Sequence, residues 1–156
     1  MSHAPIVSVR PLEPQDETHW RILFGSYREF YRLEPDEAVT SKVWDWLMDP
    51  QHECEGVVAL FENNIVAIGH YQRFSLPSAG TVGIFLDDLF TSPAARGKGA
   101  ARAIIRRLVE IAGSEGLSLV RWTTAADNHQ AQALYNQVAT RTHWVTYDAA
   151  PSTSIT

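Results

Sequence analysis

The stretch Leu89–Arg102 constrains this chain more than any other, because an apolar run passes through a glycine-rich turn directly into a helical pattern. No Ser, Thr, Asp or Asn after Gly97 caps the first backbone N–H groups of that helix. Three basic side chains crowd the end where the helix dipole is positive: Arg96, Lys98 and Arg102. A bound anion would accept the uncapped N–H groups and offset the cations, so the stretch predicts a phosphate or pyrophosphate site. An ordinary glycine-rich turn with solvated arginines is the alternative.

Two other phosphate loops fail against the same residues. A Walker A loop containing Lys98 requires glycine at position 92 and Ser or Thr at position 99, where the chain has Ser92 and Gly99. A dinucleotide fingerprint beginning at Gly97 requires Gly or Ala at position 102, where the chain has Arg102. That fingerprint also follows the first strand of a parallel sheet, whereas the strands predicted before this loop form an antiparallel meander.

Apolar periodicity predicts the elements of the rest of the chain. The predicted strands are Ile6–Arg10, Val57–Phe61, Ile65–Phe74, Thr81–Thr91, Leu117–Thr124 and Thr142–Tyr147. The predicted helices are Gln15–Arg32, Asp36–Met48, a third across Ala101–Ala112, and Asn128–Ala139. The pair Asn63–Asn64 suits a tight hairpin turn, and the strand–helix–strand order around the third helix implies one locally parallel pair. The length of 156 residues suits a single domain, 1–148, with 149–156 as a disordered tail.

The segment Arg96–Ala101 resembles the coenzyme-binding motif of the GNAT acetyltransferases: Gln or Arg, two residues, Gly, one residue, then Gly or Ala. The segment Ile84–Phe90 looks like the acidic strand of the polyamine acetyltransferase branch, and Asn128–Tyr135 resembles the family's last helix. This resemblance covers nearly the whole chain. It implies an α/β (α+β) fold with a mixed, mostly antiparallel central sheet of about six strands flanked by about four helices. It also implies an N-acetyltransferase with acetyl-CoA as co-substrate.

The resemblance assigns the coenzyme contacts. In the family, backbone N–H groups of the loop bind the coenzyme pyrophosphate, and the preceding strand pairs with the pantetheine arm. The strand residues that match here are Leu89, Phe90 and Thr91. The loop residues that match are Arg96, Gly97, Lys98, Gly99, Ala100, Ala101 and Arg102. Tyr135 resembles the general acid that protonates the departing thiolate, although its spacing fits a core tyrosine equally well. Asn128 resembles the residue that hydrogen-bonds the pantetheine arm, with a helix cap as the alternative.

An acidic pair, Asp87 and Asp88, lies within the strand predicted at Thr81–Thr91, which is expected to be central in the sheet. Adjacent strand residues point to opposite faces, so at most one of the two is expected to face the substrate. That carboxylate could bind the substrate ammonium or accept its proton through water, and a structural salt bridge to an arginine carries similar weight. Tyr27 and Tyr31 carry hydroxyls that a dry core would have to satisfy, so one of them is a candidate for substrate binding.

Composition narrows the partners. The net charge of -5 argues against a nucleic-acid or membrane surface, because both need a basic face. Cys54 is the single cysteine, and the chain shows neither a secretory signal nor an apolar run of spanning length, so a cytoplasmic protein is expected. The six histidines lack ligand spacing, so no metal is predicted.

The acceptor is the least constrained part of the prediction. The leading hypothesis is acetyl transfer to the primary amine of a small molecule by direct attack. The alternatives are a protein or peptide amine as acceptor, and a non-catalytic module that binds acetyl-CoA. A homodimer built on the C-terminal strand is also allowed, with Trp144, Val145 and Tyr147 as the contact residues.

Overall fold

The computed structural model describes residues 6–153, which divide into two compact units at Thr123 and Thr124. Of the tail that was predicted to be disordered, residues 154–156 lie outside the described part of the chain. The first unit holds the sheet and three helices, and the second holds one helix and the C-terminal segment. No helix in the described part of the chain is long and apolar enough to cross a membrane.

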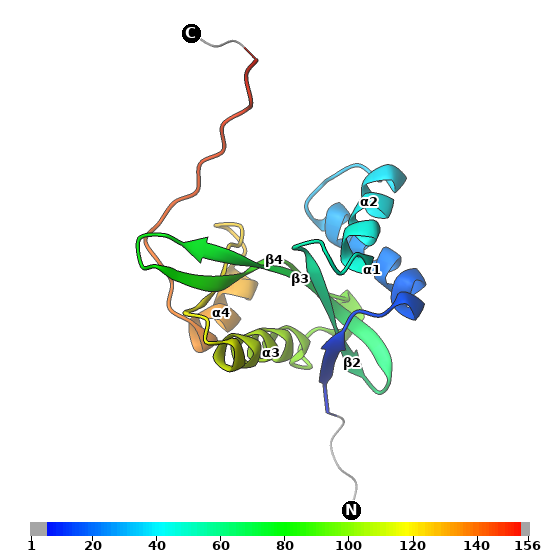
Figure 1. Ribbon diagram of the computed structural model, residues 1–156. Coiled ribbons are helices and arrows are strands. Elements are labelled where there is room, and N and C mark those ends of the chain that lie inside the picture. Colours follow the sequence, from blue (N-terminus) through cyan, green and yellow to red (C-terminus); the bar gives the residue numbers. More distant parts are fainter. Residues whose placement is uncertain (1–5, 154–156) are drawn as a thin grey trace, which may run out of the picture. The chain divides into compact units, whose positions relative to one another are not determined.

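Five strands form a single sheet in the order β1-β2-β3-β4-β5 (Figure 1). Their bounds are β1 Ser8–Pro11, β2 Glu55–Phe61, β3 Asn64–Leu76, β4 Thr81–Thr91 and β5 Val120–Trp122. The first four strands pair antiparallel in sequence order, and β4 pairs with β5 in parallel. The mixed, mostly antiparallel sheet predicted from the sequence is therefore confirmed.

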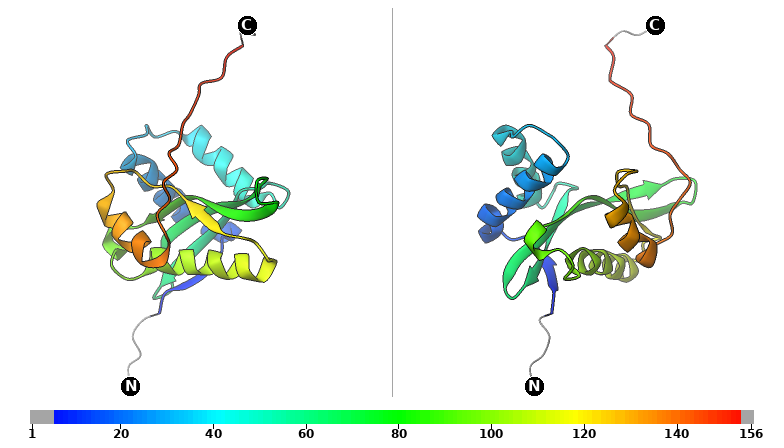
Figure 2. Two further views of the ribbon diagram at one scale, coloured as in Figure 1. Left: turned by 90° about the vertical axis from the view of Figure 1, so that its left-hand side faces the viewer. Right: turned by 180° about the vertical axis from the view of Figure 1, so that it is seen from behind.

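Helices cover both faces of this sheet. The bounds are α1 Glu17–Phe30, α2 Glu37–Met48 and α3 Ala100–Glu115, with single 3-10 turns at Pro14–Asp16 and Pro93–Ala95. Figure 2 shows α3 on the face opposite to α1 and α2. Neighbouring residues of β3 mark the two faces: His70 contacts Trp20 of α1, whereas a side chain at position 69 would meet Ile104 of α3.

The apolar stripes predicted for the helices form the core. On one face, α1 and α2 bury an aromatic cluster against β2, β3 and β4: Trp20, Leu23, Phe24 and Trp44 pack with Val58, Ile68 and Phe90. On the other face, α3 buries Ile104, Ile105 and Leu108. Each buried side chain of this size contributes about 1.5–3 kcal/mol of transfer free energy, so the two clusters fix the helices on the sheet.

The first hairpin turn lies one residue earlier than predicted. Glu62 and Asn63 occupy the turn, with φ angles of 51° and 65°, and Asn64 is already the first residue of β3, opposite Phe61. A two-residue turn with positive φ at both central positions matches the right-handed twist of the flanking strands. The apolar alternation of both strands sets this register, so glutamate takes the first positive-φ position although asparagine is favoured there.

β5 is shorter than the predicted Leu117–Thr124. Gly116 ends α3 in the left-handed conformation, at φ 71°, and the Leu117 N–H donates to the Ala112 carbonyl at 2.8 Å. This pattern is a Schellman cap, so Leu117 completes the end of α3, while the backbone of Ser118 and Leu119 already bonds to β4.

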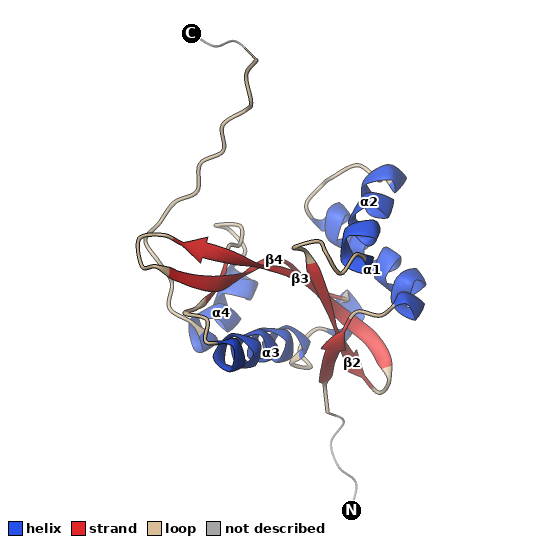
Figure 3. Ribbon diagram, viewed as in Figure 1, coloured by secondary structure: helices blue, strands red, loops and turns tan. Residues whose placement is uncertain are grey.

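The predicted strand Thr142–Tyr147 does not form. After α4 (His129–Val138) the described chain runs to residue 153 without a strand, as Figure 3 shows. Trp144, Val145 and Tyr147 are 74%, 73% and 89% exposed, so the apolar alternation has no partner strand or core to bury it. The sheet therefore has five strands across the described residues, and the expectation of about six is corrected.

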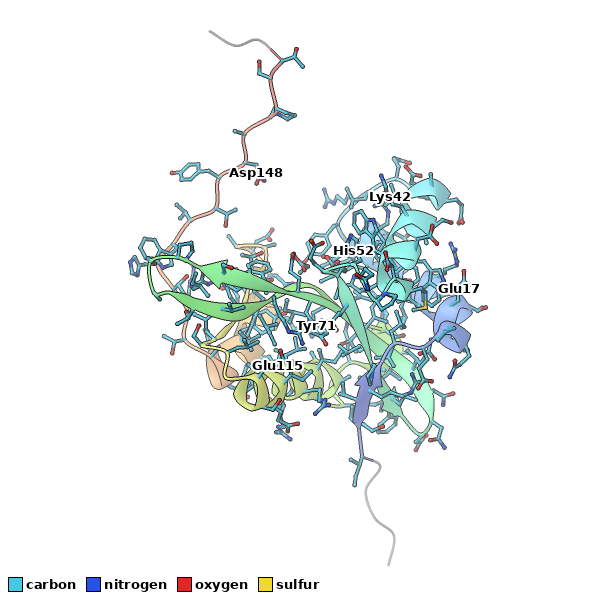
Figure 4. All side chains as sticks on the ribbon, viewed as in Figure 1. Glu17, Lys42, His52, Tyr71, Glu115 and Asp148 are labelled. Carbon is cyan, nitrogen blue, oxygen red and sulfur yellow. The ribbon has the colours of Figure 1, made fainter. Side chains whose placement is uncertain are left out.

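The buried carboxylate of Asp16 is expected to contribute strongly to stability. Asp16 accepts two hydrogen bonds from Arg10, at 2.7 and 2.9 Å, and one from the Glu13 backbone N–H at 2.8 Å. We expect Asp16→Asn to lower the free energy of unfolding by about 2 kcal/mol, measured by urea denaturation at neutral pH. The matched control is Glu17→Gln at the exposed start of α1 (Figure 4), where loss of the ion pair with Arg21 should cost no more than about 0.5 kcal/mol.

The pH dependence of this contribution follows from the direction of the pKa shift. The hydrogen bond from Arg10 lowers the pKa of Asp16 from its ordinary 3.8, against the opposing effect of burial. The stabilisation is therefore fully present above pH 3.8 and is lost as the pH falls through the lowered folded-state pKa. Equal losses of stability in Asp16→Asn and Glu17→Gln would contradict this account.

Candidate active site

The glycine loop, Arg96–Arg102, adopts the uncapped geometry that the sequence predicted. Gly99 is the N-cap of α3 with φ 84°, and no side chain accepts a hydrogen bond from the first turn of the helix. Gly97 also has a positive φ, 82°, and nothing lies within 4 Å of the position that a Cβ would take at either glycine. The loop therefore presents backbone N–H groups with open space in front of them, which is the arrangement that binds phosphate at a helix N-terminus.

Two basic side chains of the loop lie over aromatic rings. The guanidinium carbon of Arg96 is 5.9 Å from the centroid of Phe30, and the Lys98 Nζ is 4.9 Å from the centroid of Phe61. These cation–π contacts hold the charges beside the loop. Both residues stay exposed to solvent, so their charges are accessible to an anion at the loop.

The strand before the loop keeps a free backbone edge. The backbone before and in β5 pairs with β4 from Val82 to Leu86, whereas the other edge of β4 pairs with β3 as far as Thr91. Among residues 6–153, no strand pairs with the β5-side edge of β4 beyond Leu86. The backbone of Leu89, Phe90 and Thr91 can therefore take an extended ligand as an added strand.

A β-bulge at Asp87 corrects the expectation that the two carboxylates face opposite sides. Asp88 lies opposite His70 and Leu86 lies opposite Tyr71, so Asp87 is an extra residue in β4 with no partner across the ladder. The side chains of His70 and Gln72, two residues apart on β3, share one face of the sheet. His70 contacts Asp88, and Gln72 donates to Asp87 at 3.1 Å. Both carboxylates therefore lie on the α1 face, because the extra residue breaks the alternation.

Asp88 is held by two donors. The Tyr27 hydroxyl donates to Asp88 Oδ1 at 2.6 Å, and His70 Nδ1 lies 2.8 Å from Asp88 Oδ2. Burial raises the pKa of Asp88, but the hydrogen bonds from His70 and Tyr27 more than offset it, so the pKa falls below the ordinary 3.8. Asp88 is therefore ionised at neutral pH. The described contacts of Asp87 and Asp88 include no arginine, so they do not form the structural salt bridge that was the alternative interpretation.

Asp87 has the opposite character. Its side chain is exposed, and its hydrogen bonds come from Gln72. Partial burial of the carboxyl, together with the negative charge of Asp88, raises the pKa of Asp87 above 3.8, although the hydrogen bond from Gln72 opposes this. Two carboxylates whose pKa values are displaced in opposite directions are suited to different roles, one as a fixed anion and one as a proton acceptor.

The two candidate tyrosines of α1 differ in position. Tyr27 is half-buried, and burial followed by the charge of Asp88 raises its pKa, so it remains a donor. Its ring contacts Tyr31 at 5.0 Å and Phe90 at 6.1 Å between centroids. Tyr31 is 40% exposed, and burial followed by the charge of Asp88 raises its pKa too. The end of α1 thus forms an aromatic wall beside the acidic pair.

A cavity of about 490 Å³ lies between the end of α2 and the start of β2, with Cys54 on its wall. Burial, followed by the charges of Asp87 and Asp88, raises the pKa of the Cys54 thiol to about 12. The thiol is therefore neutral at physiological pH. The residues that line this cavity do not include Asp87 or Asp88.

The remaining two sequence candidates belong to the second unit. Asn128 caps α4, since its side-chain oxygen accepts from the Ala131 N–H at 3.2 Å, as the alternative interpretation expected. Tyr135 lies in the middle of α4 and is partly buried. The coenzyme contact of Asn128 and the acid role of Tyr135 stay predictions from the family resemblance.

Sequence reasoning missed three polar residues of the site: Trp20, His70 and Gln72. His70 is 1% exposed and Trp20 is fully buried. His70 and Gln72 stand on either side of Tyr71 in a predicted strand, so they share one face of it, which was the available signal of a polar face. Trp20, the hydrogen-bond partner of His70, carries no such signal, because an indole on an apolar helix stripe is ordinary core packing.

Comparisons with known proteins bear on this geometry. The sequence model of the acetyltransferase (GNAT) family matches residues 19–139. The chain is 30% identical over 143 residues to the D-amino-acid N-acetyltransferase HPA3 of Saccharomyces cerevisiae, which covers 90% of this chain and 89% of that protein. It is 31% identical over 134 residues to the uncharacterized N-acetyltransferase YhfO of Bacillus subtilis, which covers 84% of this chain and 87% of that protein.

Solved structures share the fold. A ribosomal-protein-alanine N-acetyltransferase from Brucella melitensis biovar Abortus 2308 superposes with a TM-score of 0.80 at 22% identity, covering 93% of this chain and 99% of that one. The aminoglycoside N-acetyltransferase AAC(6')-Iy, solved in complex with CoA, superposes with a TM-score of 0.78 at 15% identity, covering 97% and 99%. At these identities the likeness establishes the architecture.

Proposed function

Because the chain belongs to the GNAT family of N-acetyltransferases, we propose that it transfers the acetyl group of acetyl-CoA to the primary amine of a small molecule by direct attack. The observation that carries the proposal is the combination, on one strand, of a free β4 edge leading to the uncapped glycine loop and a bulge that presents two carboxylates. The free edge suits the pantetheine arm, the loop suits the pyrophosphate, and the carboxylates suit a cationic acceptor.

The proposed chemistry moves two protons. The acceptor arrives as an ammonium ion bound by the anion Asp88 and loses a proton through water to Asp87, the carboxylate with the raised pKa. The free amine attacks the thioester carbonyl, the carbon–sulfur bond breaks, and the thiolate of CoA takes a proton from Tyr135. A backbone N–H of the β4 edge stabilises the oxyanion formed during the attack.

A small acceptor is favoured over a protein by the name of one relative. The yeast relative is named as an acetyltransferase of D-amino acids, which are small primary amines.

The test of the function is calorimetric titration with acetyl-CoA, followed by a free-thiol assay over D- and L-amino acids, polyamines and short lysine peptides. We expect saturable binding of acetyl-CoA and thiol release with one class of small amine. Thiol release with the peptides alone would replace the small-molecule acceptor with a protein acceptor. Binding without release on any amine would favour a non-catalytic module, and absence of binding would overturn the proposal.

Asp87→Asn is expected to remove the acid limb of the pH profile. In the wild type, kcat/KM for the acceptor should fall as the pH drops through the raised pKa of Asp87, because protonation removes the base. The variant should lose roughly 100-fold in kcat near neutral pH and show no such limb. The matched control is Asp45→Asn on the exposed side of α2, which changes the net charge equally. An unchanged acid limb in Asp87→Asn would assign the base to another group.

A further inference from the structure

A chain of three hydrogen bonds runs from the aromatic core to the acidic pair. Trp20 Nε1 donates to His70 Nε2 at 2.9 Å, His70 Nδ1 contacts Asp88 Oδ2 at 2.8 Å, and the Tyr27 hydroxyl donates to Asp88 Oδ1 at 2.6 Å. The groups come from α1, β3 and β4, which are far apart in the sequence. Trp20 and His70 are buried, whereas Tyr27 is half-buried and the side chain of Asp88 is 28% exposed.

The indole N–H of Trp20 fixes which nitrogen of His70 carries the ring proton. The indole N–H is a donor and has no acceptor lone pair, so His70 Nε2 must be unprotonated where it accepts from Trp20. The remaining ring proton of His70 then lies on Nδ1 and points at Asp88. A second proton on His70 would set two N–H groups against each other in a buried site. Trp20 therefore holds His70 as a neutral donor to Asp88.

Packing fixes the His70 ring as well as its tautomer. His70 is 1% exposed, and its ring lies 5.6 Å from Phe24 in an edge contact and 5.8 Å from Trp20. Trp20 is fully buried and stacks on Phe24, with 4.9 Å between the ring centroids. The His70 Nδ1–H is therefore a rigid donor, and it selects the rotamer of the Asp88 carboxylate.

We infer that Trp20 and His70 are a positioning pair that orients Asp88 to receive the ammonium group of the acceptor. The pair rests on the proposed function, because it acts through the carboxylate that binds the amine. Asp88 takes one donor on each oxygen, which leaves a lone pair on each oxygen for an N–H of the acceptor. The other titratable groups that face Asp88 are Tyr27 and Tyr31 of α1, Asp87 of β4, and Cys54 before β2.

The pair explains why a fixed anion lies beside the bulge. An aspartate with free rotation could turn back to the backbone or pair with Gln72, which is already hydrogen-bonded to Asp87. Two donors from opposite sides, α1 and β3, restrict Asp88 to one geometry. A preorganised anion binds an ammonium ion without the cost of reorienting the side chain at the moment of binding.

The first test reads the tautomer directly and needs no activity. In protein labelled with ¹⁵N-histidine, the long-range ¹H–¹⁵N spectrum should show one ring with the proton on Nδ1 and an acceptor Nε2, and this signal should vanish in His70→Asn. A proton on Nε2 of His70 in the wild type would overturn the inference.

The second test separates positioning from packing. Trp20→Phe keeps an aromatic ring but removes the N–H donor, and Trp44→Phe is the matched control in the same cluster, because Trp44 packs against Trp20 at 5.2 Å and does not bond His70. We expect Trp20→Phe to raise KM for the acceptor roughly 10-fold, with KM for acetyl-CoA unchanged. His70→Leu should raise KM for the acceptor by roughly 10- to 100-fold, and His70→Asn, which keeps one N–H near Nδ1, should recover part of the loss.

The outcomes distinguish the two levels of the proposal. Absence of acetyl transfer in the wild type overturns the proposed function and, with it, the role of the pair. Wild-type transfer together with an acceptor KM in Trp20→Phe and folded His70→Leu equal to that of Trp44→Phe overturns the positioning pair alone. If His70→Leu does not fold, the comparison of Trp20→Phe with Trp44→Phe decides the question.

Discussion

Replacing Gly99 by valine is expected to weaken the binding of acetyl-CoA by roughly 100-fold. Gly99 has φ 84° at the N-cap of α3, a backbone conformation that costs a β-branched residue about 1–2 kcal/mol or more. That strain is present with and without the coenzyme, so it lowers the free energy of unfolding. The loss of affinity comes from the added side chain, which would enter the open space beside the loop where the pyrophosphate is proposed to lie.

The matched control for Gly99→Val is Gly80→Val. Gly80 has φ 65° in the β3–β4 turn and, like Gly99, has nothing within 4 Å of the position that a Cβ would take. Both variants carry backbone strain, so both should lower the free energy of unfolding by a similar amount. Calorimetric titration should show weakened acetyl-CoA binding in Gly99→Val only. Equal affinities in the two variants would remove the glycine loop from the coenzyme site.

Replacing Tyr135 by phenylalanine is expected to lower kcat by roughly 100- to 10,000-fold, the usual contribution of a general acid. The affinity for acetyl-CoA and KM for the acceptor should change little, because the phenol proton is needed only when the thiolate leaves. The change removes a single oxygen from a partly buried side chain of α4, so the helix should persist.

The control for Tyr135→Phe is Tyr147→Phe, the same substitution at a residue of the second unit that is 89% exposed. Single-turnover measurements with pre-bound acetyl-CoA separate the chemical step from product release. Tyr147→Phe should retain the wild-type rate. A Tyr135→Phe rate equal to that of Tyr147→Phe would assign the thiolate's proton to water or to another side chain.

Local patterns were sufficient to predict the glycine loop. An uncapped helix start and two glycines are properties of consecutive residues, and the structure reproduces them with positive φ at Gly97 and Gly99. Apolar spacing likewise located α1, α2 and α3, because an amphipathic stripe must be buried wherever the helix packs. The bounds of β4, Thr81–Thr91, were predicted to the residue.

Two parts of the prediction failed for reasons that involve distant residues. The opposite-face assignment of Asp87 and Asp88 assumed a regular strand, whereas the pairing of β3 with β4 inserts a bulge at Asp87. The strand expected at Thr142–Tyr147 has the right alternation, but alternation produces a strand only when another strand supplies hydrogen-bond partners.

The sequence by itself therefore determined the helices, the antiparallel meander and the glycine loop, since each depends on residues that are near neighbours in the chain. Only the tertiary structure decided that Asp88 is held by two donors from other elements, whereas Asp87 stays exposed with hydrogen bonds from Gln72 alone among its described partners. That difference depends on Tyr27 of α1 and His70 of β3, which meet Asp88, and on Trp20, which donates to His70. Hydrogen bonds and burial act over a few ångströms in space and set the pKa and orientation of a group wherever its partners lie in the sequence.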